Sequence, residues 1–93
     1  MDNDELLGDV VASVVEKVLM NVGLATHAKV IDILDAFDLI FSDCYRNPDV
    51  LNFALKEVFD NDHLTVVEKI KIGLSGLEDY NPKLVAFIQK LGK

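Results

Sequence analysis

Apolar residues in the first quarter of the chain come in adjacent pairs that recur about every four positions. They are Leu6, Leu7, Val10, Val11, Val14, Val15, Val18, Leu19 and Val22. This spacing gathers them on one broad face of a helix, whereas a strand would place the members of each pair on opposite faces. The pattern predicts a helix over residues 3–22, with Asp2 and Glu5 capping its start and Gly23 ending it.

The next apolar positions predict a second helix, which Thr26 can cap. Its inward-facing residues would be Val30, Ile31, Leu34, Phe37 and Phe41. The run AFDLIFSDCYRN contains neither glycine nor proline, so the pattern does not define where this helix ends. Residues 37–46 are open to three interpretations: a fraying helix, a single turn or a short extended piece.

The stretch NPDVLNFALKEVFDNDHLTVVEKIKI predicts two further helices with clear start signals. Asn47 can accept a capping hydrogen bond, Pro48 suits the first helical position, and Asp49 complements the helix dipole. This helix should run to about residue 60. After a turn, Thr65 and Glu68 form a capping-box pattern for the next helix.

Glycine and proline delimit the last part of the chain. Gly73 and Gly76 are interpreted as loosening the end of the fourth helix, with close approach of another helix as the alternative. Asn81-Pro82 repeats the cap-plus-proline start and predicts a last helix that ends at Gly92. No linker, repeat or low-complexity stretch interrupts the 93 residues, so residues 1–93 are predicted to form a compact five-helix, all-α single domain.

Charge is distributed unequally between the two halves. Residues 1–45 contain nine acidic and two basic residues, whereas residues 46–93 contain seven of each, so the whole formal net charge of −7 lies in the first half. Such a surface repels nucleic-acid phosphates and anionic membranes and favours a basic protein partner. Asp32, Asp35 and Asp38, spaced by three, are predicted to form an acidic docking ridge along the second helix.

Compartment and chemistry follow from the remaining residue types. Cys44 is the only cysteine, which excludes an internal disulfide and fits a reducing cytoplasm. The acidic start MDNDELL is unlike a secretory signal, and no apolar run approaches the ~20 residues of a membrane span. His27, His63 and Cys44 lack metal-ligand spacing, and no base neighbours Cys44 in sequence. We therefore expect no enzymatic activity, no metal and no cofactor.

Most of the chain resembles a family of small archaeal domains that includes the Nitrosopumilus output domain. The resemblance rests on VVEKVLMNVG at residues 14–23, NPDVLNFALKEVF at 47–59 and TVVEKIKIGL at 65–74. The family often has glycine after the phenylalanine, where this chain has Asp60-Asn61, so the turn itself departs from the pattern. The resemblance implies a signal-output or protein-interaction role and supplies no catalytic residues.

These observations predict a cytoplasmic interaction module that relays a signal by protein contact. Hydrophobic residues make up 51% of the chain, which favours an oligomer or a docking surface, and we expect a homodimer. The wide apolar stripe of the first helix is the expected interface, through Val11, Val15, Val18 and Val22. The alternatives are a helical pocket for a small apolar ligand and, less favoured, a DNA-binding regulator that would use Lys69 and Lys71.

Overall fold

A computed structural model describes residues 3–76 and 82–92, and the all-α class is confirmed: no residue in these ranges lies in a strand. The α-helices are α1 (Asn3–Val22), α2 (Leu24–Ala36), α3 (Pro48–Phe59), α4 (His63–Leu74) and α5 (Pro82–Lys90). Short 3-10 turns occupy Phe41–Asp43 (η1) and Asp60–Asp62 (η2). The predicted caps Asp2, Glu5 and Asn81 lie outside the described side chains.

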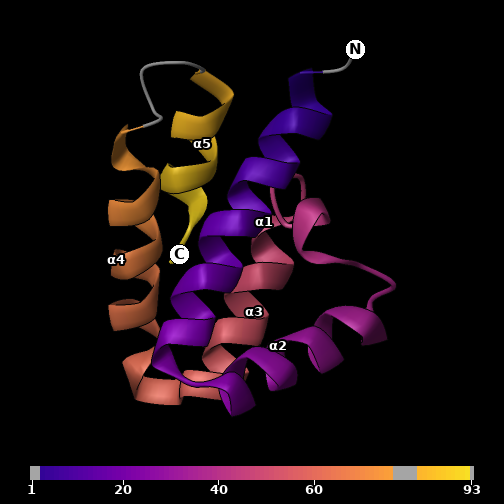
Figure 1. The fold of residues 1–93 in the computed structure, drawn as a ribbon, viewed down its shortest axis with the longest axis vertical. Coiled ribbons are helices and arrows are strands. Elements are labelled where there is room, and N and C mark those ends of the chain that lie inside the picture. The colour runs from indigo at the N-terminus through magenta and orange to yellow at the C-terminus, as the bar shows by residue number, and fades with distance from the viewer. Residues whose placement is uncertain (1–2, 77–81, 93) are drawn as a thin grey trace.

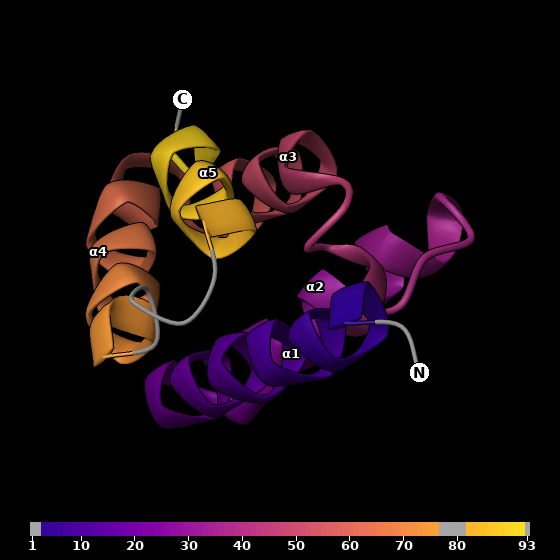
Figure 2. The same cartoon turned by 90° about the horizontal axis from the view of Figure 1, so that it is seen from above.

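The helices enclose a single core, with α3 and α4 packed antiparallel and α1 lying alongside α4 (Figure 1). Figure 2 shows α3, α4 and α5 grouped together, with α1 along one side of the group. Each helix turns its apolar stripe inward, since burying that stripe supplies most of the stabilising free energy. The core includes Val11, Val15, Leu19, Val30, Leu34, Leu51, Leu55, Ile70, Leu74, Leu84, Phe87 and Leu91.

Two helix starts differ from the sequence-based predictions. Leu24 begins α2 directly after Gly23, and the hydroxyl of Thr26 donates to the Gly23 carbonyl oxygen (2.6 Å) within the first turn. His63 begins α4 directly after η2, so Thr65 already lies inside the helix. The capping roles predicted for Thr26 and for the Thr65–Glu68 pair are therefore wrong, because each helix begins two residues before the predicted capping threonine.

The start of α3 lies at Pro48 as predicted, but Asn47 does not cap it through its side chain. The Nδ2 group of Asn47 instead donates to the Asp43 carbonyl oxygen (3.0 Å). This bond closes the turn that follows η1 and ties the segment before α3 to the helix start. Asn47 therefore stabilises the loop rather than the free N–H groups of α3.

Close packing explains one of the two glycines near the end of α4. A Cβ atom at Gly73 would lie 2.7 Å from Val14 Cγ1 of α1, whereas a Cβ at Gly76 would meet nothing within 4 Å. Gly73 is the penultimate residue of α4, and its missing side chain allows Val14 of α1 to approach, as the close-approach interpretation predicts.

Candidate functional site

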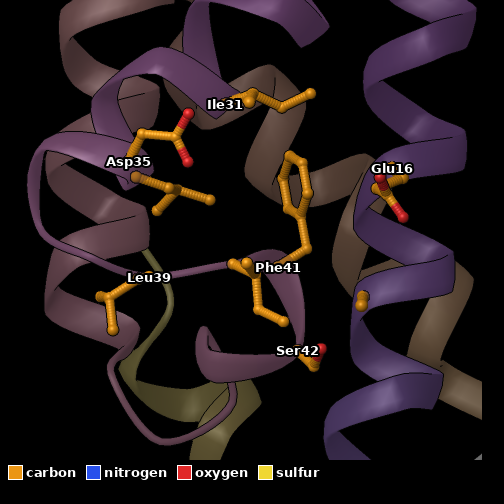
Figure 3. A pocket seen from close by; sticks show the side chains of 9 residues that line it. Glu16, Ile31, Asp35, Leu39, Phe41 and Ser42 are labelled. Atoms are coloured by element: carbon orange, nitrogen blue, oxygen red, sulfur yellow. The ribbon is translucent and has the colours of Figure 1, made fainter.

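A cleft of about 290 Å³ opens between α1, α2 and the segment that joins α2 to η1 (Figure 3). Its polar lining consists of Glu16, Asp35 and Ser42. Its apolar lining comes from all three parts: Ala12, Ile31, Leu34, Leu39, Ile40 and Phe41. The volume lies at the lower limit of the roughly 300–1,000 Å³ typical of small-molecule sites.

The cleft exists because α2 stops early. Asp38 adopts a positive φ of 58°, which ends the helical path after Ala36 and turns the chain back toward α1. The single turn η1 follows, with Asp43 Oδ2 accepting a hydrogen bond from the Ile40 N–H (3.0 Å). Residues 37–46 therefore form turns on either side of Ile40, which has extended backbone geometry, rather than a continued helix.

A glycine lets η1 pack directly on α1. A Cβ atom at Gly8 would lie 2.6 Å from the Ser42 carbonyl oxygen, so only glycine fits this position without a shift of the backbone. The contact holds the 41–43 turn against the first half of α1 and fixes one side of the cleft.

Phe41 forms the aromatic wall of the cleft and packs against His27 of α2. Its ring is stacked on the His27 ring, with centroids 5.5 Å apart and planes 3° from parallel. His27 Nε2 lies 3.3 Å from Glu16 Oε1, a contact that joins α2 to α1. Phe41 is only 7% exposed, so this wall is a fixed part of the fold.

The rim of the cleft is acidic. Glu16 from α1 and Asp35 from α2 line it on opposite sides of the Phe41 ring in Figure 3, and none of the described lining residues is basic. Asp32 and Asp38 are exposed nearby on the same stretch of chain. The local charge therefore attracts cations and repels anions.

Large apolar side chains lie exposed on the segment after α2 and on α3. Phe37 is 49% exposed, Ile40 63% and Phe53 46%, and the rings of Phe37 and Phe53 meet edge to face at 5.8 Å. Ile40 also belongs to the cleft lining, whereas Phe37 and Phe53 form a ring pair outside it. We call the whole set the acidic–apolar surface: Asp32, Asp35, Phe37, Asp38, Ile40 and Phe53.

Two of the four valines predicted as an interface are buried in the core of the domain. Val11 and Val15 are 0% exposed and pack in the core, Val18 is half-buried, and only Val22 is exposed, at 40%. The prediction that Val11 and Val15 face a partner is wrong, because the domain's own core uses the centre of the α1 stripe. Phe37, predicted to face inward, is exposed instead.

The predicted acidic ridge is only partly formed. Asp32 and Asp35 lie exposed on α2, but Asp38 follows the end of the helix and has left-handed backbone geometry. The prediction that these three carboxylates form a single row along one helix is therefore wrong. The structure instead brings Asp35 to the mouth of the cleft beside Ile40.

Cys44 is unsuited to nucleophilic chemistry. Its side chain is fully buried, and burial together with the nearby Asp43 carboxylate raises its pKa from 9.0 to about 12. The thiol thus stays protonated near neutral pH, while thiol reactivity requires the thiolate. Within the described residues, no group of three or more His, Cys, Asp or Glu side chains could hold a metal ion.

A second hollow lies at the start of α3, with a volume of about 430 Å³. Arg46 and Lys90 line it together with Asp49, so its charges are mixed. Despite its larger volume it has few apolar walls, and it offers no single chemistry to a ligand.

Compared with protein-family models, curated proteins and solved structures, the chain shows no match. The resemblance to the archaeal output-domain family therefore stays a prediction. None of the described helices combines the length and apolar character needed to cross a membrane.

The cleft was not predictable from local sequence patterns. Glu16 and His27 are eleven positions apart on different helices, and their contact depends on the angle between α1 and α2. The useful local signal was the run Asp38-Leu39-Ile40-Phe41, in which Leu39 and Ile40 fall outside the stripe that Leu34, Phe37 and Phe41 would continue. An apolar run that fits no helix stripe indicates a turn with exposed apolar residues.

Proposed function

We propose that this chain is a non-enzymatic interaction module that docks a basic, amphipathic segment of another protein on its acidic–apolar surface. The observation that carries the proposal is the coincidence of exposed Phe37, Ile40 and Phe53 with exposed Asp32, Asp35 and Asp38. Contiguous exposed apolar side chains rimmed by charge are typical of protein-binding sites. Aromatic side chains are favoured as anchors in such sites.

Electrostatics selects the kind of partner. The carboxylates of the surface would attract lysine and arginine side chains and speed their approach. They would repel nucleic-acid phosphates. Lys69 and Lys71, the candidates for DNA contact, lie on α4 beside the exposed Glu68. No run of further basic residues adjoins them in the sequence, so DNA binding has little support.

Homodimer formation stays a prediction, but the acidic–apolar surface is a poor interface for it. Two copies meeting there would bring the carboxylates of one copy close to those of the other, and like charges across an interface are unfavourable. Light scattering at micromolar concentration tests self-association directly. A signalling role in the cytoplasm, relayed by contact, is the biological setting that we propose for the module.

A small apolar ligand in the cleft is the second candidate, supported by the cleft itself. Its volume of about 290 Å³ is at the bottom of the range for such sites, and Ile40 at its mouth is 63% exposed. A mostly solvent-exposed lip suits a side chain presented by a partner better than an enclosed small molecule.

Nuclear magnetic resonance with a model peptide tests the docking function. The probe is a 16-residue amphipathic helix of leucine and lysine, and its control has every lysine replaced by glutamate. We expect the basic peptide to shift amide signals of residues 32–43 and 53, and the acidic peptide to leave them unchanged.

A matched pair of charge reversals locates the site. Asp35→Lys should weaken binding of the basic peptide at least tenfold, whereas Glu68→Lys, which changes the net charge equally on exposed α4, should change it less than threefold. Equal binding of both peptides, or equal effects of both reversals, would refute the proposed surface.

A further inference from the structure

Resting on the docking function proposed above, we infer the recognition chemistry of the cleft. It receives one large apolar side chain from a partner helix, and a lysine or arginine one helical turn from that side chain pairs with Asp35. The partner feature is thus an apolar anchor with a cation three or four positions away, which places both groups on one helix face.

The shape of the cleft fits a single anchor. Its inner wall is closely packed, because Leu34 is 1% exposed and the Phe41 ring is stacked on His27. Its lip is apolar and open at Ile40, which is 63% exposed. An anchor that passes Ile40 would lose contact with water on several sides, and that burial is the main favourable contribution to such binding.

Asp35 is the carboxylate available to a partner cation. Glu16 lies 3.3 Å from His27 Nε2, whereas Asp35 has no ion-pair partner among the described residues. Both carboxylates line the cleft, so a cation beside the anchor lies within reach of Asp35 and is also favoured by the charge of Glu16. The cation therefore selects among apolar segments, since an acidic or neutral segment lacks this attraction.

A helical partner fits the surroundings better than an extended one. An extended segment gains affinity mainly by adding a strand to a sheet edge, and no strand exists in residues 3–76 or 82–92. An amphipathic helix laid across α2 and the 39–42 segment needs only side-chain contacts.

A double-mutant cycle between protein and peptide tests the inference. The probe is a 16-residue amphipathic peptide with one central phenylalanine and a lysine four positions after it, measured by calorimetry. Replacing its phenylalanine by serine should weaken binding about 10- to 100-fold, the range expected for losing one buried large side chain. Replacing its lysine by glutamine should weaken binding to the wild-type protein about three- to tenfold.

The cation contact predicts a specific coupling. In Asp35→Asn the lysine peptide should lose most of its advantage over the glutamine peptide, because the pairing is lost and only the attraction of the other carboxylates remains. In Asp32→Asn, a matched change on the same helix outside the cleft lining, the lysine peptide should keep its advantage. If the lysine peptide loses its advantage equally in Asp35→Asn and Asp32→Asn, the assignment of Asp35 is overturned and general charge attraction accounts for the binding.

The outcomes separate this inference from the docking function. If the peptide shifts signals of the acidic–apolar surface but the phenylalanine-to-serine change has no effect, the anchor inference fails while docking stands. If no peptide shifts those signals, the docking function itself fails. If phenethylamine alone binds as tightly as the peptide, the cleft is a small-ligand site and the partner-helix inference is overturned.

Discussion

The side chain of Asn52 holds the backbone of Gly92 against α3. Asn52 Oδ1 accepts a hydrogen bond from the Gly92 N–H (2.7 Å), and its Nδ2 donates to the Lys90 carbonyl oxygen (3.1 Å). Asn52 is the one buried polar side chain among the described residues, at 5% exposed, and both ends of its amide are satisfied. Gly92 has a φ of +90°, which glycine adopts without strain, so the end of α5 can turn toward Asn52.

Asn52→Ala should lower the free energy of unfolding by about 2–3 kcal/mol, because it removes both bonds and leaves two backbone groups without their partners. Urea unfolding monitored by circular dichroism measures the change. The Gly92 amide should also exchange with solvent faster in the variant. Asn61→Ala, in the exposed η2 turn, is the control and should change stability by less than about 0.5 kcal/mol. Equal effects of the two substitutions would contradict the conclusion that the Asn52 side chain holds the Gly92 backbone against α3.

Periodic patterns predicted the helices better than they predicted the site. The α1 stripe and the Pro48 and Pro82 starts lie where the spacing and proline signals placed them. Such signals are local, since they depend on neighbours within one or two turns. Whether an apolar stripe faces the core or a partner depends on tertiary packing, which is why Val11 and Val15 were misassigned.

The cleft depends on contacts that local patterns do not encode. Phe41 meets His27 across the α2–η1 turn, and Gly8 meets Ser42 across 34 positions. Periodicity left residues 37–46 open because Asp38 breaks the helix without glycine or proline. A positive φ at aspartate is uncommon, so composition alone gave no reason to expect it.

Gly8→Ala should destabilise the fold although alanine favours helices by about 1 kcal/mol over glycine. The added Cβ would lie 2.6 Å from the Ser42 carbonyl oxygen, and a backbone atom cannot move aside as a flexible side chain can. We expect a net loss of about 1–3 kcal/mol in urea unfolding. Gly76→Ala, where a Cβ meets nothing within 4 Å, should stay within about 1 kcal/mol of wild type. A stabilised Gly8→Ala would show that α1 and η1 are farther apart.

Cys44 should make stability fall at alkaline pH. Its pKa is 9.0 when unperturbed and about 12 in the folded protein, so above pH 9 the unfolded state releases the proton while the folded state keeps it. The unfolded state then binds fewer protons, and the free energy of unfolding decreases by up to ~1.4 kcal/mol per pH unit between these values. Urea unfolding at pH 8, 9 and 10 should show this decrease in wild type and less of it in Cys44→Ala. Parallel pH profiles of the two proteins would refute the contribution of Cys44.

Val15→Asp should unfold the domain rather than release monomers from a dimer. Val15 is 0% exposed in the core, and a carboxylate there would lose its hydration without gaining a partner, at a cost of several kcal/mol. We expect loss of the helical circular-dichroism signal or a midpoint of thermal unfolding lower by more than about 10 °C. Met20→Asp, on the same helix at 47% exposure, is the control and should keep the wild-type signal. Light scattering gives the opposite outcome if Val15→Asp stays folded and has half the molar mass of the wild-type protein. In that case Val15 contacts a second copy, and its burial in the monomer core is wrong.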